Sequence, residues 1–184
     1  MRDVFYNREW DYLFVKCGEG KPDRSLDENG ATLLFRGDEF LGANIANPKG
    51  MTLQDGLNVR LSDKDEEALR GYLGAHYKDA EPTNFVYAKV VSKEEHPLYE
   101  RKSILTLDAG KRLSTVTGYQ NVDSGDLIAI LLPGPRMDGT YFAPRVEKNI
   151  AIDCEVCSPK DLRLGDDGTK AYIGNDEEAG KPVF

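Results

Sequence analysis

Histidine and cysteine are scarce in this chain of 184 residues, which contains His76, His96, Cys17, Cys154 and Cys157 and no others of either type. An odd number of cysteines is typical of reduced thiols and argues against a disulfide framework. Cys154 and Cys157 have the spacing of a zinc or redox pair, but a four-ligand zinc site needs a second pair, which the sequence lacks. We therefore expect no metal and no cofactor; a metal or redox role of this pair is the open alternative.

Long hydrophobic runs are also missing. No stretch of about 18 apolar residues occurs, so no helix is expected to cross a membrane. Residues 1–17 carry Asp3, Glu9 and Asp11 among their apolar residues and lack the unbroken apolar core of a signal peptide. These absences predict a cytoplasmic protein.

An excess of positive charge, which phosphate binding favours, is missing too, because the formal net charge is −8. The charge is distributed unevenly along the chain. Residues 1–80 hold 11 basic and 15 acidic side chains, residues 84–165 hold 11 of each, and residues 166–184 hold 2 basic and 5 acidic ones. Because the middle segment is neutral, a local basic surface can still exist on it.

Catalytic motifs are absent as well. The sequence contains no GxSxG nucleophile turn, no GKS or GKT phosphate loop, no HExxH and no GxGxxG. Adjacent carboxylates such as Glu94 and Glu95 point apart on a strand and do not form an acid–base pair. We expect a protein without enzymatic activity; a small enzyme centred on Asn44 and Asn47 is the most distant alternative.

Residues 1–80 predict a small domain that mixes strands with helix, an α+β arrangement. Residues 4–17 read as two strands joined by a polar turn. Residues 31–47 predict a hairpin that turns at Gly37, since glycine adopts positive φ easily. Residues 21–30 are rich in turn formers and predict a loop.

A helix is predicted to begin at Ser62 or Asp63. Either side chain can accept hydrogen bonds from the first free backbone N–H groups, and acidic residues follow where the helix dipole favours them. Apolar residues then recur at helical spacing. Residues 78–84, a charged stretch with a proline, predict a linker.

The second half of the chain, residues 84–166, changes to a strand pattern. Five strand-sized apolar runs are separated by turn signals, at residues 85–91, 103–110, 112–118, 126–132 and 149–157. Five short strands without helices predict a small closed or half-closed five-stranded β-barrel, because closure removes exposed sheet edges. Residues 167–184 are acidic and rich in glycine and predict a loosely held tail.

Binding is favoured over catalysis for residues 84–166. Small five-stranded barrels bind oligonucleotides across one sheet face and its flanking loops, which requires basic, polar and aromatic side chains. The candidates are Tyr87, Lys89, Arg101, Lys102, Tyr119, Arg136 and Arg145. Each of them has an ordinary alternative as an outward strand residue, a barrel-end residue or a loop charge.

Five short motifs follow one another between residues 85 and 167. They are His96-Pro97, Leu107–Gly110, Thr115–Gly118 with Asn121-Val122, Leu132–Gly134, and Cys157-Ser158. Together they resemble the EMAP-II-like tRNA-binding domain. That OB-fold module occurs in the bacterial phenylalanyl-tRNA synthetase beta chain, in many methionyl-tRNA synthetases and in free-standing tRNA-binding proteins.

This resemblance implies a non-catalytic protein that holds tRNA or other structured RNA on an OB-fold barrel. We expect phosphate contacts from the basic candidates Lys89, Arg101, Lys102, Arg136 and Arg145. The resemblance adds Asn121 and Ser158 as matching polar positions of the family. Affinity is expected to be modest and to fall with salt.

The first half carries a second resemblance. Phe5-Tyr6-Asn7 and the run Gly42–Asn47 are similar to the amino-terminal domain of unknown function (DUF4479) of YtpR-type proteins. Those proteins have the same order, with this domain followed by a tRNA-binding module. The resemblance implies no activity for residues 1–80.

Two stretches depart from the family pattern. Ile152–Glu155 stand where the family usually reads S-x-G-M, so Glu155 brings negative charge to the RNA side. Tyr99 and Glu100 replace the family's Ala-Asp, and Arg101 replaces its lysine. The alternative is therefore an OB-fold module that has lost RNA binding and serves protein interaction or dimerisation, with a second copy or a synthetase as partner.

Overall fold

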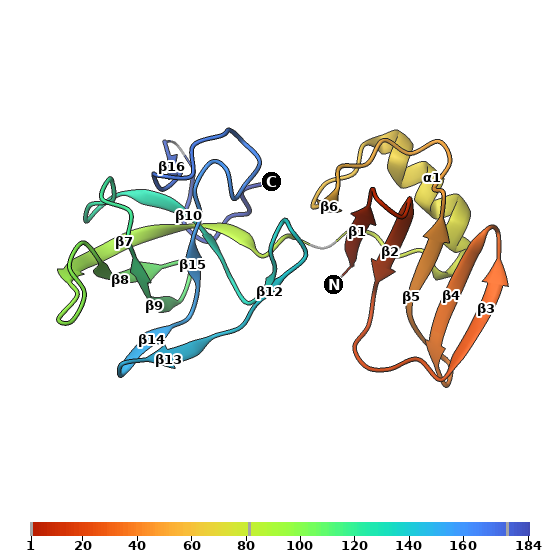
Figure 1. Cartoon of the computed structure of the whole chain (residues 1–184), viewed down its shortest axis with the longest axis horizontal. Coiled ribbons are helices and arrows are strands. Elements are labelled where there is room, and N and C mark those ends of the chain that lie inside the picture. Colours follow the sequence, from red (N-terminus) through yellow and green to blue (C-terminus); the bar gives the residue numbers. More distant parts are fainter. Residues whose placement is uncertain (1, 81, 176) are drawn as a thin grey trace. The chain divides into compact units, whose positions relative to one another are not determined.

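The computed structural model describes residues 2–80, 82–175 and 177–184, and the chain divides into two compact units, Met1–Pro82 and Thr83–Phe184. Strands predominate in both (Figure 1). The first unit holds a six-stranded antiparallel sheet in the order β3-β4-β5-β2-β1-β6. Its strands are β1 Asp3–Asn7, β2 Tyr12–Lys16, β3 Arg24–Glu28, β4 Ala31–Arg36, β5 Glu39–Ala46 and β6 Gly56–Leu57.

The predicted helix is confirmed as α1, Asp63–Leu73, followed by a 3-10 turn at Gly74–His76. Ser62 is its N-cap, and the Ser62 Oγ accepts a hydrogen bond from the backbone N–H of Asp65 at 3.2 Å. The helix buries Leu69 and Leu73, which join the apolar core on one face of the sheet. The first unit is therefore a single sheet with one helix packed on it.

The loop predicted for residues 21–30 is wrong at Arg24–Glu28, which form β3. All five side chains of this strand are exposed, so it shows none of the apolar alternation that marks a half-buried strand. The signal that was available is Asn29-Gly30, whose positive φ angles of 52° and 80° close a two-residue type I′ hairpin to β4. The hairpin predicted around Gly37 is confirmed, with φ of 58° at that glycine.

The second unit contains a five-stranded sheet in the order β15-β10-β7-β8-β9, with β16 paired to β10. The predicted runs all contain strands, and the last is split in two. The elements are β7 Phe85–Glu95, β8 Ser103–Asp108, β9 Arg112–Thr117, β10 Leu127–Leu131, β11 Gly134–Pro135, β12 Tyr141–Phe142, β13 Arg145–Glu147, β14 Ile150–Ile152, β15 Glu155–Val156 and β16 Ile173–Gly174.

The prediction was a closed or half-closed barrel, and the strand pairing does not show a closed one, since β9 and β15 share no ladder among the described residues. Individual hydrogen bonds instead join the two ends of the sheet. The Asp153 N–H donates to the Ser114 carbonyl at 2.8 Å, and the Thr115 hydroxyl donates to the Cys154 carbonyl at 2.6 Å. The sheet is thus rolled around one apolar core, but no strand ladder joins β9 to β15 among the described residues.

The C-terminal residues differ from the loose tail that their composition predicts. Ala171 is buried, Ile173 pairs with Ile128 of β10, and the Val183 N–H donates to the Phe85 carbonyl at 2.9 Å. The few apolar residues among the acidic ones contribute to this packing, because Ala171 and Ile173 join the apolar core of the second unit. Residues 171–184 are therefore part of the second unit.

The helix α1 is too short and too polar to span a bilayer, and the described part of the chain has no other helix that could do so.

Candidate nucleic-acid interface

A hollow of about 780 Å³ opens on the second unit beside β9 and β15. Its other walls are the loops around residues 136–138 and 160–169. We call it the large hollow. Four basic side chains line it, Arg136, Arg145, Lys160 and Arg163, together with three acidic ones, Asp138, Glu155 and Asp161. A neutral stretch of sequence thus gathers a slight excess of positive charge in one concave place.

Arg136 lies in this hollow, as a phosphate contact would require, but its guanidinium is already engaged. Its Nε and Nη2 donate to the two carboxylate oxygens of Glu155 at 2.7 and 2.6 Å, and its Nη1 donates to the Thr140 hydroxyl at 3.2 Å. The bond to Glu155 raises the pKa of Arg136. The forked ion pair fixes the arginine and cancels its charge locally.

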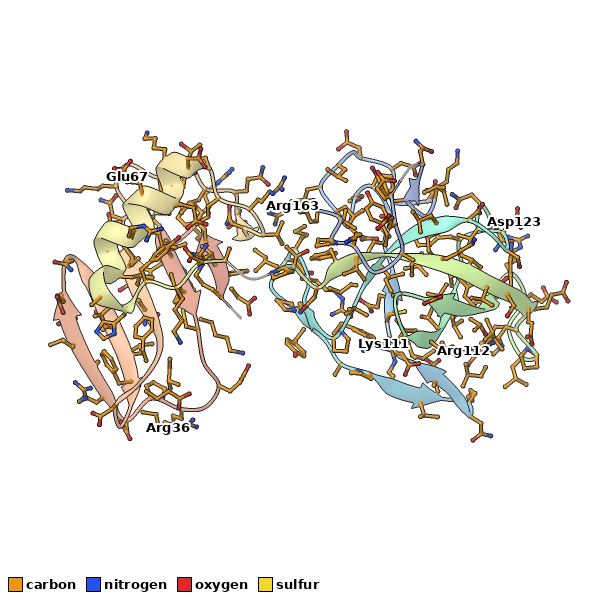
Figure 2. All side chains as sticks on the ribbon, turned by 180° about the vertical axis from the view of Figure 1, so that it is seen from behind. Arg36, Glu67, Lys111, Arg112, Asp123 and Arg163 are labelled. Carbon is orange, nitrogen blue, oxygen red and sulfur yellow. The ribbon has the colours of Figure 1, made fainter. Side chains whose placement is uncertain are left out.

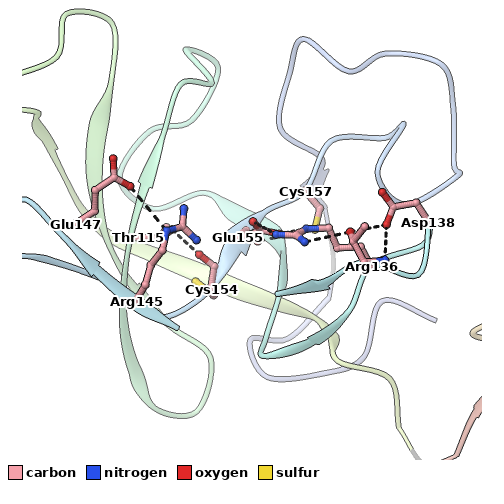
Figure 3. Close-up of polar contacts among 9 residues, drawn as sticks. Thr115, Arg136, Asp138, Arg145, Glu147, Cys154, Glu155 and Cys157 are labelled. Atoms are coloured by element: carbon pink, nitrogen blue, oxygen red, sulfur yellow. Dashed lines mark hydrogen bonds and ion pairs between the residues drawn. The ribbon is translucent and has the colours of Figure 1, made fainter. Parts of the chain in front are cut away.

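Arg145 reaches the same hollow from β13. Figure 3 shows Glu155 between the side chains of Arg145 and Arg136. Arg145 forms an ion pair with Glu147, whose carboxylate lies 3.8 Å from the Arg145 Nε, and the arginine side chain is 53 % exposed. A loose, exposed pair of this kind contributes little energy, so Arg145 can turn toward a phosphate at small cost.

Lys160 and Arg163 line the hollow from the segment after Ser158, and sequence reasoning missed both. Arg163 donates from Nη2 to the Met137 carbonyl at 2.6 Å and so ties the two loops together. Lys160 forms no ion pair within the described residues. The available signal was their position directly after Cys157-Ser158, the last of the five motifs.

A smaller hollow of about 90 Å³ adjoins the large one and shares Val116, Arg145 and Ile152 with it. Lys102 lines it, with its Nζ 4.7 Å from the centre of the Tyr99 ring. The His96 Nδ1 accepts hydrogen bonds from the N–H groups of Leu98 and Tyr99 at 3.1 and 3.2 Å. His96 therefore shapes the turn that carries Lys102.

Two of the predicted basic contacts lie outside both hollows. Lys89 is an exposed residue of β7, between Leu127 and Asp108 of the neighbouring strands. Arg101 occupies the β7–β8 turn with φ of 58°, and its carbonyl accepts a hydrogen bond from the Gln120 side chain at 2.8 Å. The structure brings Lys102, Arg136 and Arg145 together and leaves Lys89 and Arg101 apart from them.

The polar positions that the family resemblance supplied have structural roles here. The Asn121 side chain donates to the Ala171 carbonyl at 3.0 Å and accepts from the Ala171 N–H at 2.8 Å, which holds the C-terminal segment. Ser158 is fully buried, and its hydroxyl donates to Asp161 at 2.7 Å. A side chain without solvent access cannot reach a phosphate in this conformation, so the predicted contact from Ser158 is not supported.

The two aromatic candidates, Tyr87 and Tyr119, differ in their access to the large hollow. Tyr87 is 4 % exposed, too little for base stacking, and burial raises its pKa to about 12. Tyr119 lines the large hollow, and its hydroxyl donates to Asp161 at 3.3 Å. Burial also raises the pKa of Tyr119. Tyr119 is therefore the candidate that can face a bound base.

The paired cysteines are free thiols. Burial raises the pKa of Cys154 to about 12 and raises that of Cys157 as well, so both thiols are protonated at neutral pH. Within residues 2–80, 82–175 and 177–184, no three His, Cys, Asp or Glu side chains gather as a metal site would require.

No protein-family model matches the chain. By sequence it is similar to phenylalanine–tRNA ligase beta subunits. The beta subunit of Thermotoga maritima is 29 % identical over 89 residues, which is 47 % of this chain and 11 % of that protein. The beta subunit of Symbiobacterium thermophilum is 31 % identical over 130 residues, 66 % of this chain and 14 % of that protein.

By structure, the chain is similar to the MetRS related protein from Pyrococcus horikoshii, whose match covers 54 % of this chain and 88 % of that one. The identity is 14 % and the TM-score 0.39, too low to assign a fold. The matches in sequence span 11 % and 14 % of the ligase subunits' own length. The chain is therefore similar to a small part of a much larger ligase subunit.

Proposed function

We propose that this chain is a non-catalytic tRNA-binding protein whose second unit is an OB-fold module. The proposal is supported from two sides. Five motifs resemble the EMAP-II-like domain, which occurs in the phenylalanyl-tRNA synthetase beta chain. The relatives found by sequence are beta subunits of the same ligase.

The single observation that carries the proposal is the position of the hollows. Taken in chain order, β7, β8, β9, β10 and β15 form a sheet in the order 5-4-1-2-3 with its ends drawn together. An OB-fold is a partly open five-stranded barrel that binds nucleic acid with strands 2–3 and the loops between strands 1–2 and 4–5. Here β9 and those same two loops line the hollows.

The two units have different roles in this proposal. Residues 1–80 form an amino-terminal domain like that of YtpR-type proteins, and the module of residues 84–166 is completed by the packed residues 167–184. The protein acts in the cytoplasm, where tRNA is used. RNA is held mainly through its backbone and shape, because phosphate contacts need only well-placed cations.

The electrostatics of the hollow predict a modest affinity. Lys102 and Lys160 form no ion pair among the described residues, and Arg145 has only the loose contact with Glu147. Arg136 is neutralised by Glu155. Few free cations give a shallow salt dependence, because each phosphate contact contributes about 0.7 to 0.9 to the slope of log K against log salt.

The test is fluorescence anisotropy with bulk cellular tRNA at about 50 and about 200 mM salt, a range over which phosphate-dependent affinity changes strongly. Lys160→Ala and Lys102→Ala should each weaken binding and reduce the salt slope by nearly one contact. Lys89→Ala is the matched control, since it removes the same charge outside the hollows. Equal losses in all three variants would mean that the hollows do not hold the RNA.

One observation favours a second candidate, a protein-interaction module that has lost RNA binding. The Glu155 carboxylate accepts two hydrogen bonds from the guanidinium of Arg136. The family pattern has no acidic residue at the position of Glu155. Absence of tRNA binding even at the lower salt concentration would support this candidate and overturn the first.

A further inference from the structure

One edge of the first sheet is formed by β3, the outermost strand in Figure 1. Among the described residues its only ladder partner is β4. All five residues of the strand, Arg24–Glu28, are exposed, including Leu26 with 42 % of its surface open. An open strand edge is a template for pairing with another strand.

The hairpin geometry determines which backbone groups of β3 point outward. In a hairpin with a two-residue turn, the flanking residues exchange both backbone hydrogen bonds, and bonded and non-bonded pairs then alternate. Glu28 and Ala31 flank the Asn29-Gly30 turn. The alternation therefore turns the N–H and C=O groups of Ser25 and Asp27 toward the open edge.

The side chains of β3 are complementary to themselves when the strand is reversed. In an antiparallel pair of two copies with Leu26 opposite Leu26, Arg24 of each copy lies opposite Glu28 of the other. Ser25 then lies opposite Asp27, which pairs the outward backbone groups of both copies. Leu26 falls at a non-hydrogen-bonded pair, where facing side chains come closest.

Neighbouring registers are disfavoured by charge. The outward groups alternate along the strand, so only shifts by two residues keep the backbone bonds. A shift in one direction puts Asp27 opposite Asp27, and a shift in the other puts Asp23 opposite Asp27. Like charges directly opposite each other destabilise a sheet, so the pattern selects one register.

We propose that β3 is a docking edge for a second copy of this chain, joined antiparallel about Leu26 into one continuous sheet. The Arg24 guanidinium lies over the Phe35 ring, 4.3 Å from its centre, which holds the cation beside the edge. Because the strand is only five residues long, the interface is small, and we expect a dimer dissociation constant in the micromolar range. The inference does not depend on RNA binding.

Sedimentation velocity of the full chain across the micromolar range tests the backbone part of the proposal. Wild type should dimerise with rising concentration. Ser25→Pro should raise the dimer dissociation constant at least about tenfold, because proline removes an outward N–H yet is tolerated on edge strands. Ser25→Ala is the matched control and should dimerise like wild type. A wild type that stays monomeric, or a dimer unaffected by Ser25→Pro, would overturn the proposal.

A charge-exchange cycle tests the register without relying on proline. Arg24→Glu and Glu28→Arg should each weaken the dimer by about 2- to 30-fold, since the two-fold axis doubles each opposite-charge pair. The double variant should recover most of the affinity, because the pairs form between copies. Losses that add in the double variant would exclude this register.

Discussion

The two units use an antiparallel sheet in opposite ways. The first leaves its sheet open, with one helix on one face and, among the described residues, no second strand paired to β3. The second rolls its sheet until β9 meets the segment before β15. In the first unit, basic side chains such as Arg2 and Arg36 form ion pairs, with Glu66 and Glu39 respectively, which neutralise their charge. The rolled unit keeps Lys102 and Lys160 available in a concave site, which shows that shape and not net charge creates a candidate RNA surface.

The largest expected effect is a loss of stability confined to the first unit. The Arg2 side chain is 3 % exposed and donates two hydrogen bonds to the Glu66 carboxylate. Arg2→Met leaves that carboxylate with only the hydrogen bond from the Tyr77 hydroxyl and should lower the unfolding free energy by about 3 kcal/mol. Urea unfolding followed by the fluorescence of Trp10 reports on this unit, since the chain has one tryptophan.

Arg36→Ala is the control for that prediction. Arg36 forms an ion pair with Glu39 at 2.5 Å, but both side chains are about half exposed. Its loss should change stability by less than about 1 kcal/mol. A similar loss in both variants would mean that burial of the Arg2 pair is not what stabilises the unit.

The next effect is on the second unit. Asn121→Ala removes both hydrogen bonds to Ala171 and should destabilise the unit by about 1 to 3 kcal/mol. Amide hydrogen exchange at residues 171–174 should become faster, because this clamp holds the C-terminal segment. A loss of tRNA affinity with unchanged exchange would instead make Asn121 an RNA contact.

A smaller effect, on tRNA affinity, tests how the charge of the large hollow governs binding. Glu155→Gln removes the negative charge that neutralises Arg136 in the large hollow and leaves at most one acceptor oxygen for its guanidinium. Affinity for tRNA should rise, and its salt slope should steepen by about 0.7 to 0.9. Asp123→Asn, an exposed acid away from the hollow, is the control for net charge (Figure 2). Weaker binding in Glu155→Gln would show that Glu155 positions the arginine for RNA.

The smallest effect is a pH dependence in the first unit. Burial opposes ionisation of Glu66, but the hydrogen bonds from Arg2 and Tyr77 outweigh it and lower its pKa below 4.5. A depressed pKa contributes stability that is present above 4.5 and is lost as the pH falls through the folded-state value. The stability gap between wild type and Glu66→Gln should therefore narrow below about pH 4.5 in acid-unfolding titrations.

Local signals predicted most of the elements. The Ser62 cap, the Gly37 hairpin and the apolar runs of the second half depend on neighbouring residues, and the structure confirms all three. The strand β3 was missed because its side chains are wholly exposed and leave no apolar pattern. The packing of Ala171 was missed because the acidic and glycine-rich composition around it outweighs the few apolar residues that hold the C-terminal segment against the sheet.

The candidate site was predicted less well, because spacing says little about contacts made across the sheet. Arg136 and Arg145, two of the predicted contacts, both line the large hollow, but nothing near Arg136 in sequence shows that Glu155 binds it. Ser158 matches the family motif, yet its hydroxyl is turned inward to Asp161. Lys160 and Arg163 entered the hollow only through the path of their loop.

The amino-acid sequence by itself determined the helix, the Gly37 hairpin, the main strands of the second unit and the resemblance to a tRNA-binding module, because these follow from patterns a few residues long. Only the tertiary structure decided which cations share a hollow, which of them an acid neutralises and which strand edge stays open. The physical reason is that rolling the sheet brings distant residues such as Arg136 and Glu155 into contact, while the free edge exists only where no later strand pairs.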